Sequence, residues 1–313
     1  MKNTWLADNS FEYIKAALSE RGYDLGEMIG EGRGSIVFSL INNSTLGCKI
    51  RPYSKEAVKR ILFARAAYQF DKKRFPYLPI PDPNRKIEFV LNSDELTDES
   101  KDWEIEPIIT KERAFLATIH ERLSPIRSMN ERELLKLTID IAEALDKMYD
   151  PLRFSLHGIG KGDILFSHLI DRYVIADCDK VSRFIDNDLR YRYGDPRTSA
   201  PELNTYHYYE SSSVFSLGFF LRKLVTRGIN PEDEMADKLD KINSAIRPAV
   251  IQIEKMNLEP LDDTNSKYSR GFIRLINRMT SYYPEDRPSP KQTAEAARKL
   301  REMPSHLREE IDI

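Results

Sequence analysis

The sequence predicts an α+β protein in which a β-rich part precedes a mainly helical part. Short apolar and β-branched runs separated by turn residues occupy residues 23–110, and helical spacing dominates from residue 111 onward. No strand–helix–strand repeat runs along the chain, which favours α+β lobes with a cleft between them. We therefore expect a helical extension over residues 1–22, a small β-rich lobe over 23–110 and a larger α-helical lobe over 111–313.

Composition and charge limit the classes of partner. The chain has 313 residues, of which 41% are hydrophobic and 31% charged, as in folded soluble proteins. Its 48 Lys and Arg nearly balance 50 Asp and Glu, so the net charge of −2 favours neither nucleic acid nor an anionic membrane. Cys48 and Cys178 are expected to be reduced thiols. Without an apolar signal core near residue 1, we expect a cytoplasmic protein or an effector exported without a cleaved signal peptide.

The β-rich part is expected to begin after a short amphipathic helix over Phe11–Arg21. Strands are then predicted over Tyr23–Ile29, Ser35–Ile41 and Leu46–Ile50, with a turn at Asn42–Ser44. Further along, helical spacing covers Ser54–Phe70 and a proline-rich passage without helix covers Phe75–Pro83. Two more strands are expected on either side of an acidic loop at residues 93–102, over Lys86–Leu91 and Trp103–Ile109.

The second part is expected to be built from six helices. Their apolar residues recur at helical spacing, over Glu112–Leu123, Glu131–Tyr149, Val214–Arg227, Glu232–Met256, Arg270–Thr280 and Lys291–Arg301. The stretch between Arg227 and Arg270 is long and highly charged, and we regard it as a candidate partner surface.

A glycine cluster between the first two predicted strands is a candidate phosphate cradle. Glycines let backbone N–H groups approach phosphate oxygens without a Cβ in the way, here at Gly30, Gly32 and Gly34. Twelve residues beyond Val37 lies Lys49, and strand alternation directs Gly47 and Lys49 to one face. A lysine on that face can hold phosphate oxygens, although a solvated lysine at a strand end fits the same local pattern.

Taken in order, the motifs of the chain resemble those of the eukaryotic-type protein-kinase family over residues 23–300. The glycine-rich loop and Lys49 are followed by Ile175–Asp179, which is similar to the strand that leads into the family's magnesium-binding Asp-Phe-Gly. Further matches are residues 194–202, which resemble the segment ending in Ala-Pro-Glu, 213–218, which resemble the start of a later helix, and 284–289. The resemblance implies a bilobal protein kinase-like fold, with a small β-rich N-lobe and a larger α-helical C-lobe. It also implies that Arg287 pairs with Glu202.

The resemblance fails at the catalytic loop. Asp163 takes the place of the family's asparagine, and the base aspartate is replaced by Gly158 or, if His157 is aligned with the family's histidine, by Ile159. Neither residue can accept or orient a hydroxyl proton during phosphoryl transfer.

Two further family residues are missing. Residues 63–70 contain no glutamate to orient Lys49, and Ser213 replaces the aspartate that braces the loop backbone. We therefore expect the brace to have been lost together with the catalytic loop.

The remaining residues outline a nucleotide site. As the resemblance implies, Val37 and Gly47 would cover one face of an adenine and Leu165 the other, while Lys49 meets phosphate. Mg²⁺ prefers oxygen ligands, which are expected from Asp163, Asp177 and Asp179. A cleft that holds no ligand, in which Asp177 pairs with Lys49, is the simpler alternative.

Two functional hypotheses follow. The first is a pseudokinase, a regulatory or scaffold module that presents a kinase-shaped surface to a protein partner, with or without bound Mg-ATP. The second is an atypical kinase or nucleotidyl transferase that uses Asp163, Asp177 and Asp179 as metal ligands, because Asp177-Cys178-Asp179 resembles the Asp-x-Asp of bacterial small-molecule kinases. These small-molecule kinases also carry His-Gly-Asp in the loop, and this chain lacks that aspartate.

Overall fold

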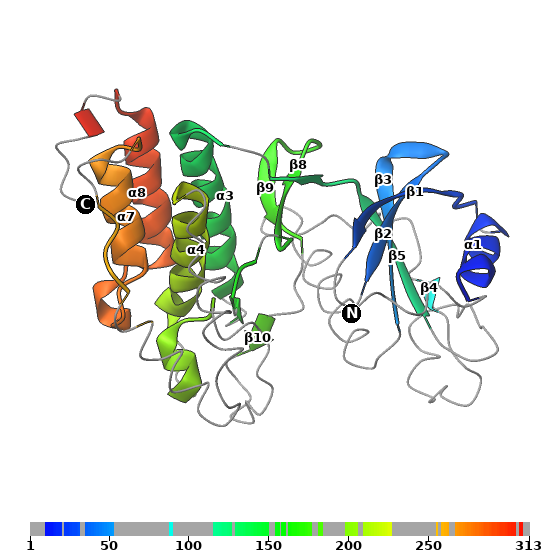
Figure 1. Ribbon diagram of the computed structural model, residues 1–313, viewed down its shortest axis with the longest axis horizontal. Coiled ribbons are helices and arrows are strands. Elements are labelled where there is room, and N and C mark those ends of the chain that lie inside the picture. Colours follow the sequence, from blue (N-terminus) through cyan, green and yellow to red (C-terminus); the bar gives the residue numbers. More distant parts are fainter. Residues whose placement is uncertain are drawn as a thin grey trace. The chain divides into compact units, whose positions relative to one another are not determined.

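In a computed structural model of the protein, the described residues form a five-stranded antiparallel sheet, two smaller sheets and a group of packed helices (Figure 1). The fold is mixed α+β, and the chain divides into two compact units: residues 1–124 with 167–171, and residues 125–166 with 172–313. The structure describes residues 10–20, 22–31, 35–52, 88–89, 115–126, 129–149, 154–156, 158–160, 162–176, 181–183, 198–205, 209–226, 255, 258–262, 267–304 and 307–308.

The first unit is built on a five-stranded sheet in the order β1-β2-β3-β5-β4, with neighbouring strands antiparallel. The strands predicted over 23–29, 35–41 and 46–50 are confirmed. The turn predicted at Asn42–Ser44 begins one residue earlier, at residues 41–42. The strand bounds are β1 Leu25–Glu31, β2 Ile36–Leu40, β3 Asn43–Pro52, β4 Glu88–Phe89 and β5 Phe115–Glu121.

Helix α1 (Ser10–Glu20) closes one face of this sheet. Its Ile14 and Leu18 are fully buried against the sheet, and the rings of Phe11 and Phe38 stack with centroids 5.2 Å apart. The turn after α1 is held by Asp24, whose carboxylate accepts hydrogen bonds from the Ser19 hydroxyl and the Asn42 amide, both at 2.6 Å. The helix predicted over Phe11–Arg21 is therefore confirmed, and it forms part of the core of the sheet unit.

The helix predicted over Glu112–Leu123 is wrong, because this segment contains strand β5. Strand β5 pairs with β3 along seven residues, from Leu46 opposite Glu121 to Pro52 opposite Phe115, and with β4 on its other edge. Its apolar residues fit either a helical or an extended period. Hydrogen bonds to a strand about 70 residues earlier in the chain, which local spacing does not reveal, select the extended form.

The second unit contains four long helices whose predicted positions are confirmed to within a few residues. They are α3 Glu131–Tyr149, α4 Glu210–Val225, α7 Arg270–Met279 and α8 Pro290–Glu302. Capping boxes begin α3, between Asn130 and Glu133, and α8, between Ser289 and Gln292. The smaller elements are β6 Ser124–Pro125, β7 Phe154–Leu156, β8 Ile164–Ser167, β9 Arg172–Ile175, β10 Val181–Arg183, η4 Pro201–Thr205 and η5 Pro284–Asp286.

Helix α3 is the central helix of this unit, and it packs along α8, α4 and β9. The carboxylate of Asp140, 5% exposed, accepts a hydrogen bond from the Tyr173 N–H at 3.1 Å and so ties α3 to β9. Burial raises the pKa of Asp140 above its usual value, opposed by this hydrogen bond and by the charges of Lys136 and Arg172.

Several predicted elements lie outside the described residues: the helix over 54–70, the helix over 232–256 except Lys255, the proline-rich passage and the strand over 103–109. Of the strand expected over 86–91, Glu88–Phe89 is described, as β4. Among the described residues, no helix combines the length and apolar character that a membrane span requires.

Gly218 allows α4 to approach the end of α7 closely. A Cβ at this position would lie 2.6 Å from the Cβ of Met279 and 3.2 Å from its carbonyl carbon. Such a distance is shorter than a van der Waals contact, and these atoms are held by the backbone of α7. The sequence therefore needs a glycine in the middle of this buried helix.

We expect Gly218→Ala to reduce the free energy of unfolding by about 1–3 kcal/mol, because overpacking outweighs the better helix propensity of alanine. Urea denaturation measures the change. Gly162→Ala is the matched control, since a Cβ there meets no atom within 4 Å, and its effect should stay within about 0.5 kcal/mol. Equal effects of the two substitutions would contradict a close α4–α7 approach.

Candidate functional site

In the first unit, the residues expected to face a nucleotide lie on one face of the sheet. Gly30 lies opposite Val37, Val37 opposite Lys49, and Lys49 opposite Thr118, so these residues form one row across β1, β2, β3 and β5. Directly opposed residues of antiparallel strands project to the same side. Gly47, two residues before Lys49, belongs to the same face.

This face lies opposite to the one that α1 covers. Ile36, Phe38, Cys48 and Ile50 alternate with the row and are buried in the core beneath α1. The alternation expected for Gly47 and Lys49 is therefore present in the register. Gly32 and Gly34 lie outside the described residues.

In the second unit, the segment between β7 and β8 corresponds to the expected catalytic loop. Gly158 has φ +80°, a left-handed conformation that side chains with a Cβ rarely adopt. Ile159 is only 1% exposed, so its side chain is part of the core. Neither candidate for the base position therefore presents a polar side chain. Leu165, expected to cover an adenine, lies in β8 and is half-buried.

Two serines of α4 hold the backbone of this loop. The N–H of Leu156 donates to the Ser213 hydroxyl oxygen at 3.0 Å, and the N–H of Gly158 donates to that of Ser216 at 3.2 Å. The expectation that the brace had been lost is wrong, because a hydroxyl oxygen accepts a hydrogen bond in place of a carboxylate. Ser216 was missed by the sequence reasoning, although the i, i+3 spacing from Ser213 places both hydroxyls on one helix face.

Asp163 closes the end of the loop. Its Oδ2 accepts a hydrogen bond from the Gly160 N–H at 2.6 Å, and its own N–H donates to the Gly160 carbonyl at 3.0 Å. The Asp163 carbonyl accepts from the N–H of Ala176 at 2.7 Å, which ties the loop to the end of β9. At 6% exposed, this carboxylate shapes the turn in which it lies.

The expected metal site is only partly described. Asp177 and Asp179 lie outside the described residues. Within the described part of the chain, no three His, Cys, Asp or Glu side chains come together as a possible metal site. A carboxylate oxygen is a suitable magnesium ligand, and Asp163 is the one member of the expected set that the structure describes.

The pairing expected between Glu202 and Arg287 is present and buried. Arg287 donates from Nη1 to Oε1 of Glu202 at 2.7 Å and from Nη2 to Oε2 at 3.0 Å. Arg287 also donates to the carbonyls of Ser281 and Tyr282, and the Ser212 hydroxyl donates to Glu202 at 2.6 Å. The interaction joins the segment that ends in Ala200-Pro201-Glu202 to the start of α4 and to the loop before α8.

The comparisons with known proteins identify no family. No protein-family model matches the chain, and no curated protein matches it.

We expect Ser213→Ala to reduce the free energy of unfolding by about 1–3 kcal/mol, because it removes the hydroxyl acceptor of a buried backbone N–H. Chemical denaturation measures the loss. Ser44→Ala, at an exposed position, should change stability by less than about 0.5 kcal/mol. If Ser213→Ala is as mild as this control, the serine does not brace the loop.

Proposed function

We propose that this chain is a protein kinase-like pseudokinase, a regulatory or scaffold module with a bilobal kinase-like fold that binds Mg-ATP without transferring phosphate. The observation that carries the proposal is the loop over residues 156–163. It is anchored as a functional loop would be, yet Gly158 and Ile159 supply no proton acceptor.

The Glu202–Arg287 pair supports the kinase-like part of the proposal. The resemblance implies that these two residues, 85 positions apart, are partners, and they form a buried bidentate ion pair. Helices at the expected positions and the hydroxyl brace from α4 agree with the same arrangement.

The backbone at position 158 supports the absence of phosphotransfer. An aspartate there would adopt φ +80°, at a cost of about 1–2 kcal/mol for a residue with a Cβ. An aspartate at position 159 would place a carboxylate in an apolar core. The loop geometry therefore disfavours an aspartate at either position and agrees with a loop that does not act as a base.

The face of the sheet opposite α1 supports nucleotide binding. Gly30 and Gly47 add no side chain to this face, Val37 supplies an apolar surface, and Lys49 adds a positive charge in the same row as Gly30 and Val37. An adenine needs a flat apolar surface and its phosphates need a cation, so the chemistry of this face suits ATP. Asp163, Asp177 and Asp179 are the proposed magnesium ligands.

We expect Mg-ATP to raise the melting temperature of the protein, because a ligand that binds the native state stabilises it by about 2.7 kcal/mol at 100 times its Kd. Lys49→Ala should remove most of the rise. Lys15→Ala removes an exposed lysine of α1, on the other side of the sheet, and should leave the rise unchanged. A thermal shift assay measures all three proteins, and an equal rise in Lys49→Ala would place the nucleotide elsewhere.

We further expect no incorporation of label from γ- or α-labelled ATP into the protein or into added acceptor substrates. Gly158→Asp, which restores a carboxylate at the position of the base, should lower the melting temperature by the strain at φ +80° and should not produce transfer. Transfer that is lost in Asp177→Ala would overturn the proposal in favour of an active enzyme with carboxylate metal ligands.

A further inference from the structure

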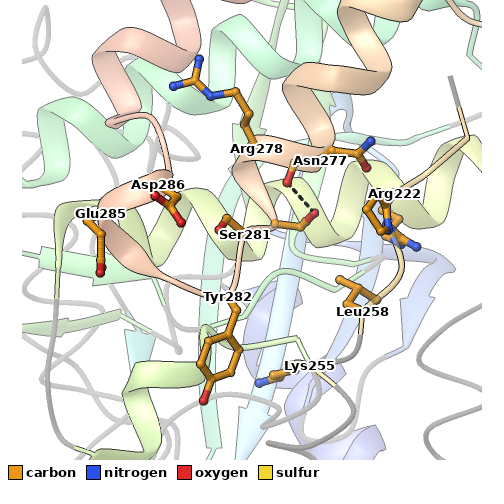
Figure 2. A pocket seen from close by; sticks show the side chains of 11 residues that line it. Arg222, Lys255, Leu258, Asn277, Arg278, Ser281, Tyr282, Glu285 and Asp286 are labelled. Carbon is orange, nitrogen blue, oxygen red and sulfur yellow. Dashed lines mark hydrogen bonds between the residues drawn. The ribbon is translucent and has the colours of Figure 1, made fainter.

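The second unit contains a pocket of about 680 Å³ that the kinase resemblance does not assign. Its wall is formed by the end of α4, by Lys255, Leu258 and Pro260, by the end of α7 and by the loop up to η5 (Figure 2). Residues 255–260 belong to the charged stretch that the sequence marks as a candidate partner surface. The volume is in the range of pockets that hold small ligands or a few side chains.

Arg222, in the last turn of α4, is a buried cation in this wall. It is 8% exposed, its guanidinium donates to the backbone carbonyl of Glu259, and its Nε is buried without a hydrogen-bond partner. In the part of the chain that the structure describes, no carboxylate forms an ion pair with it. Burial lowers the pKa of Arg222, and the nearby charge of Glu259 opposes that shift. Buried charges are usually paired, so this guanidinium favours an anion in the pocket.

Lys255 adds a second buried cation to the same wall. Its side chain is 2% exposed, its ammonium donates to the carbonyl of Ser199, and it lies 5.8 Å from the centre of the Phe215 ring. The inner wall of the pocket therefore carries two cationic side chains, Arg222 and Lys255.

The rim has the opposite charge. Glu285 and Asp286 of η5 are exposed and line the pocket, and Figure 2 shows them on the other side from Arg222. The guanidinium of Arg278 is also exposed and extends away from the other side chains (Figure 2). A simple anion would meet these acids on its way in, whereas a ligand with both charges is attracted at both ends.

The walls are held in place before a ligand arrives. The Asn277 side chain accepts from the Leu261 N–H at 2.8 Å and donates to the Leu261 carbonyl at 3.0 Å, which pins the 258–262 segment to α7. Arg287 holds the carbonyls of Ser281 and Tyr282 at 2.7 and 2.6 Å. A preformed pocket loses little conformational entropy on binding.

We propose that this pocket binds a segment of a partner protein in which an acidic and a basic side chain lie a few residues apart. The acidic group lies against Arg222 and Lys255, the basic group pairs with Glu285 and Asp286, and Leu258 with Tyr282 contact the chain between them. The inference rests on the proposed regulatory function, because it supplies the site for the partner. It involves none of the residues assigned to the nucleotide.

The test uses the full-length protein and peptides with acetylated and amidated ends, in which one Glu and one Lys are separated by one to three glycines. At least one spacing should give saturable shifts of the Leu258 methyl resonances and a measurable heat of binding. Replacing the peptide's Glu by Gln should weaken binding at least tenfold, and replacing its Lys by Gln should weaken it several-fold. A peptide that binds with a Kd of about 1 mM, or about −4.1 kcal/mol, would largely saturate the site at about 10 mM. If no resonance shifts at about 10 mM peptide, the proposal is wrong.

Variants of the protein test the two charged walls separately. Arg222→Met should reduce peptide affinity at least tenfold and should keep or raise the melting temperature, because it replaces an unpaired buried charge by an apolar side chain of similar size. The double variant Glu285→Gln/Asp286→Asn should weaken binding several-fold. Glu295→Gln, at an exposed acid of α8, is the matched control and should leave affinity unchanged.

Other outcomes separate this proposal from its rivals. If the peptides with Gln in place of Glu or Lys bind as tightly as the original peptide, the proposal is wrong. It is also wrong if free glutamate and lysine bind as tightly as the peptide, because that result indicates a small-molecule site. If Arg222→Met does not fold, the double variant Glu285→Gln/Asp286→Asn and the peptides that lack one charge still test the proposal. The two proposals can also fail separately. If the peptide binds but Lys49→Ala does not reduce the rise in melting temperature with Mg-ATP, the peptide site is supported and the proposed nucleotide site is wrong.

Discussion

The buried ion pair between Glu202 and Arg287 is the interaction on which the functional regions of the second unit depend. The Arg287 side chain is fully buried, and its charge is met by both carboxylate oxygens of Glu202 and by two backbone carbonyls, over the ring of Phe215. Removing one member of such a pair strands the other charge in the interior, at a cost of about 3–5 kcal/mol. The pair therefore constrains three segments at once: η4, the start of α4 and the loop before α8.

Both candidate sites of this unit depend on that constraint. At the start of α4, the Ser212 hydroxyl donates to Glu202, and the next residue, Ser213, accepts from the loop backbone at Leu156. On the other side, the carbonyls held by Arg287 belong to Ser281 and Tyr282, which line the charged pocket. The two proposals rest on these two features: a well-anchored loop without a proton acceptor at positions 158 and 159, and a preformed charged pocket.

In the first unit, α1 gives the two faces of the sheet different roles. Ile14 and Leu18 remove one face from water, so the alternation of β2 and β3 directs Val37 and Lys49 to the other. This division was predictable, since the period of two in a strand is local. The strand character of 115–121 was not, because its seven backbone pairs join β5 to residues 46–52, far away in the chain. The hydroxyl brace was not predictable for a related reason: Ser213 lacks the carboxylate of an aspartate, and only the position of the Leu156 N–H shows that a hydrogen-bond acceptor is all that is required.

By itself, the sequence determined the α+β class, the long helices α3, α4, α7 and α8, and the strands β1 to β3, because apolar spacing and capping residues are local patterns. It also determined the Glu202–Arg287 pair, through the order of its motifs along the chain. It further determined that no carboxylate occupies positions 158 and 159, where the kinase resemblance would place the base. Only the tertiary structure decided that β5 is a strand, that Gly158 adopts a left-handed backbone, and that Arg222 and Lys255 are buried in the wall of one pocket. These features arise from contacts between segments distant in the chain, where burial and pairing outweigh local preference.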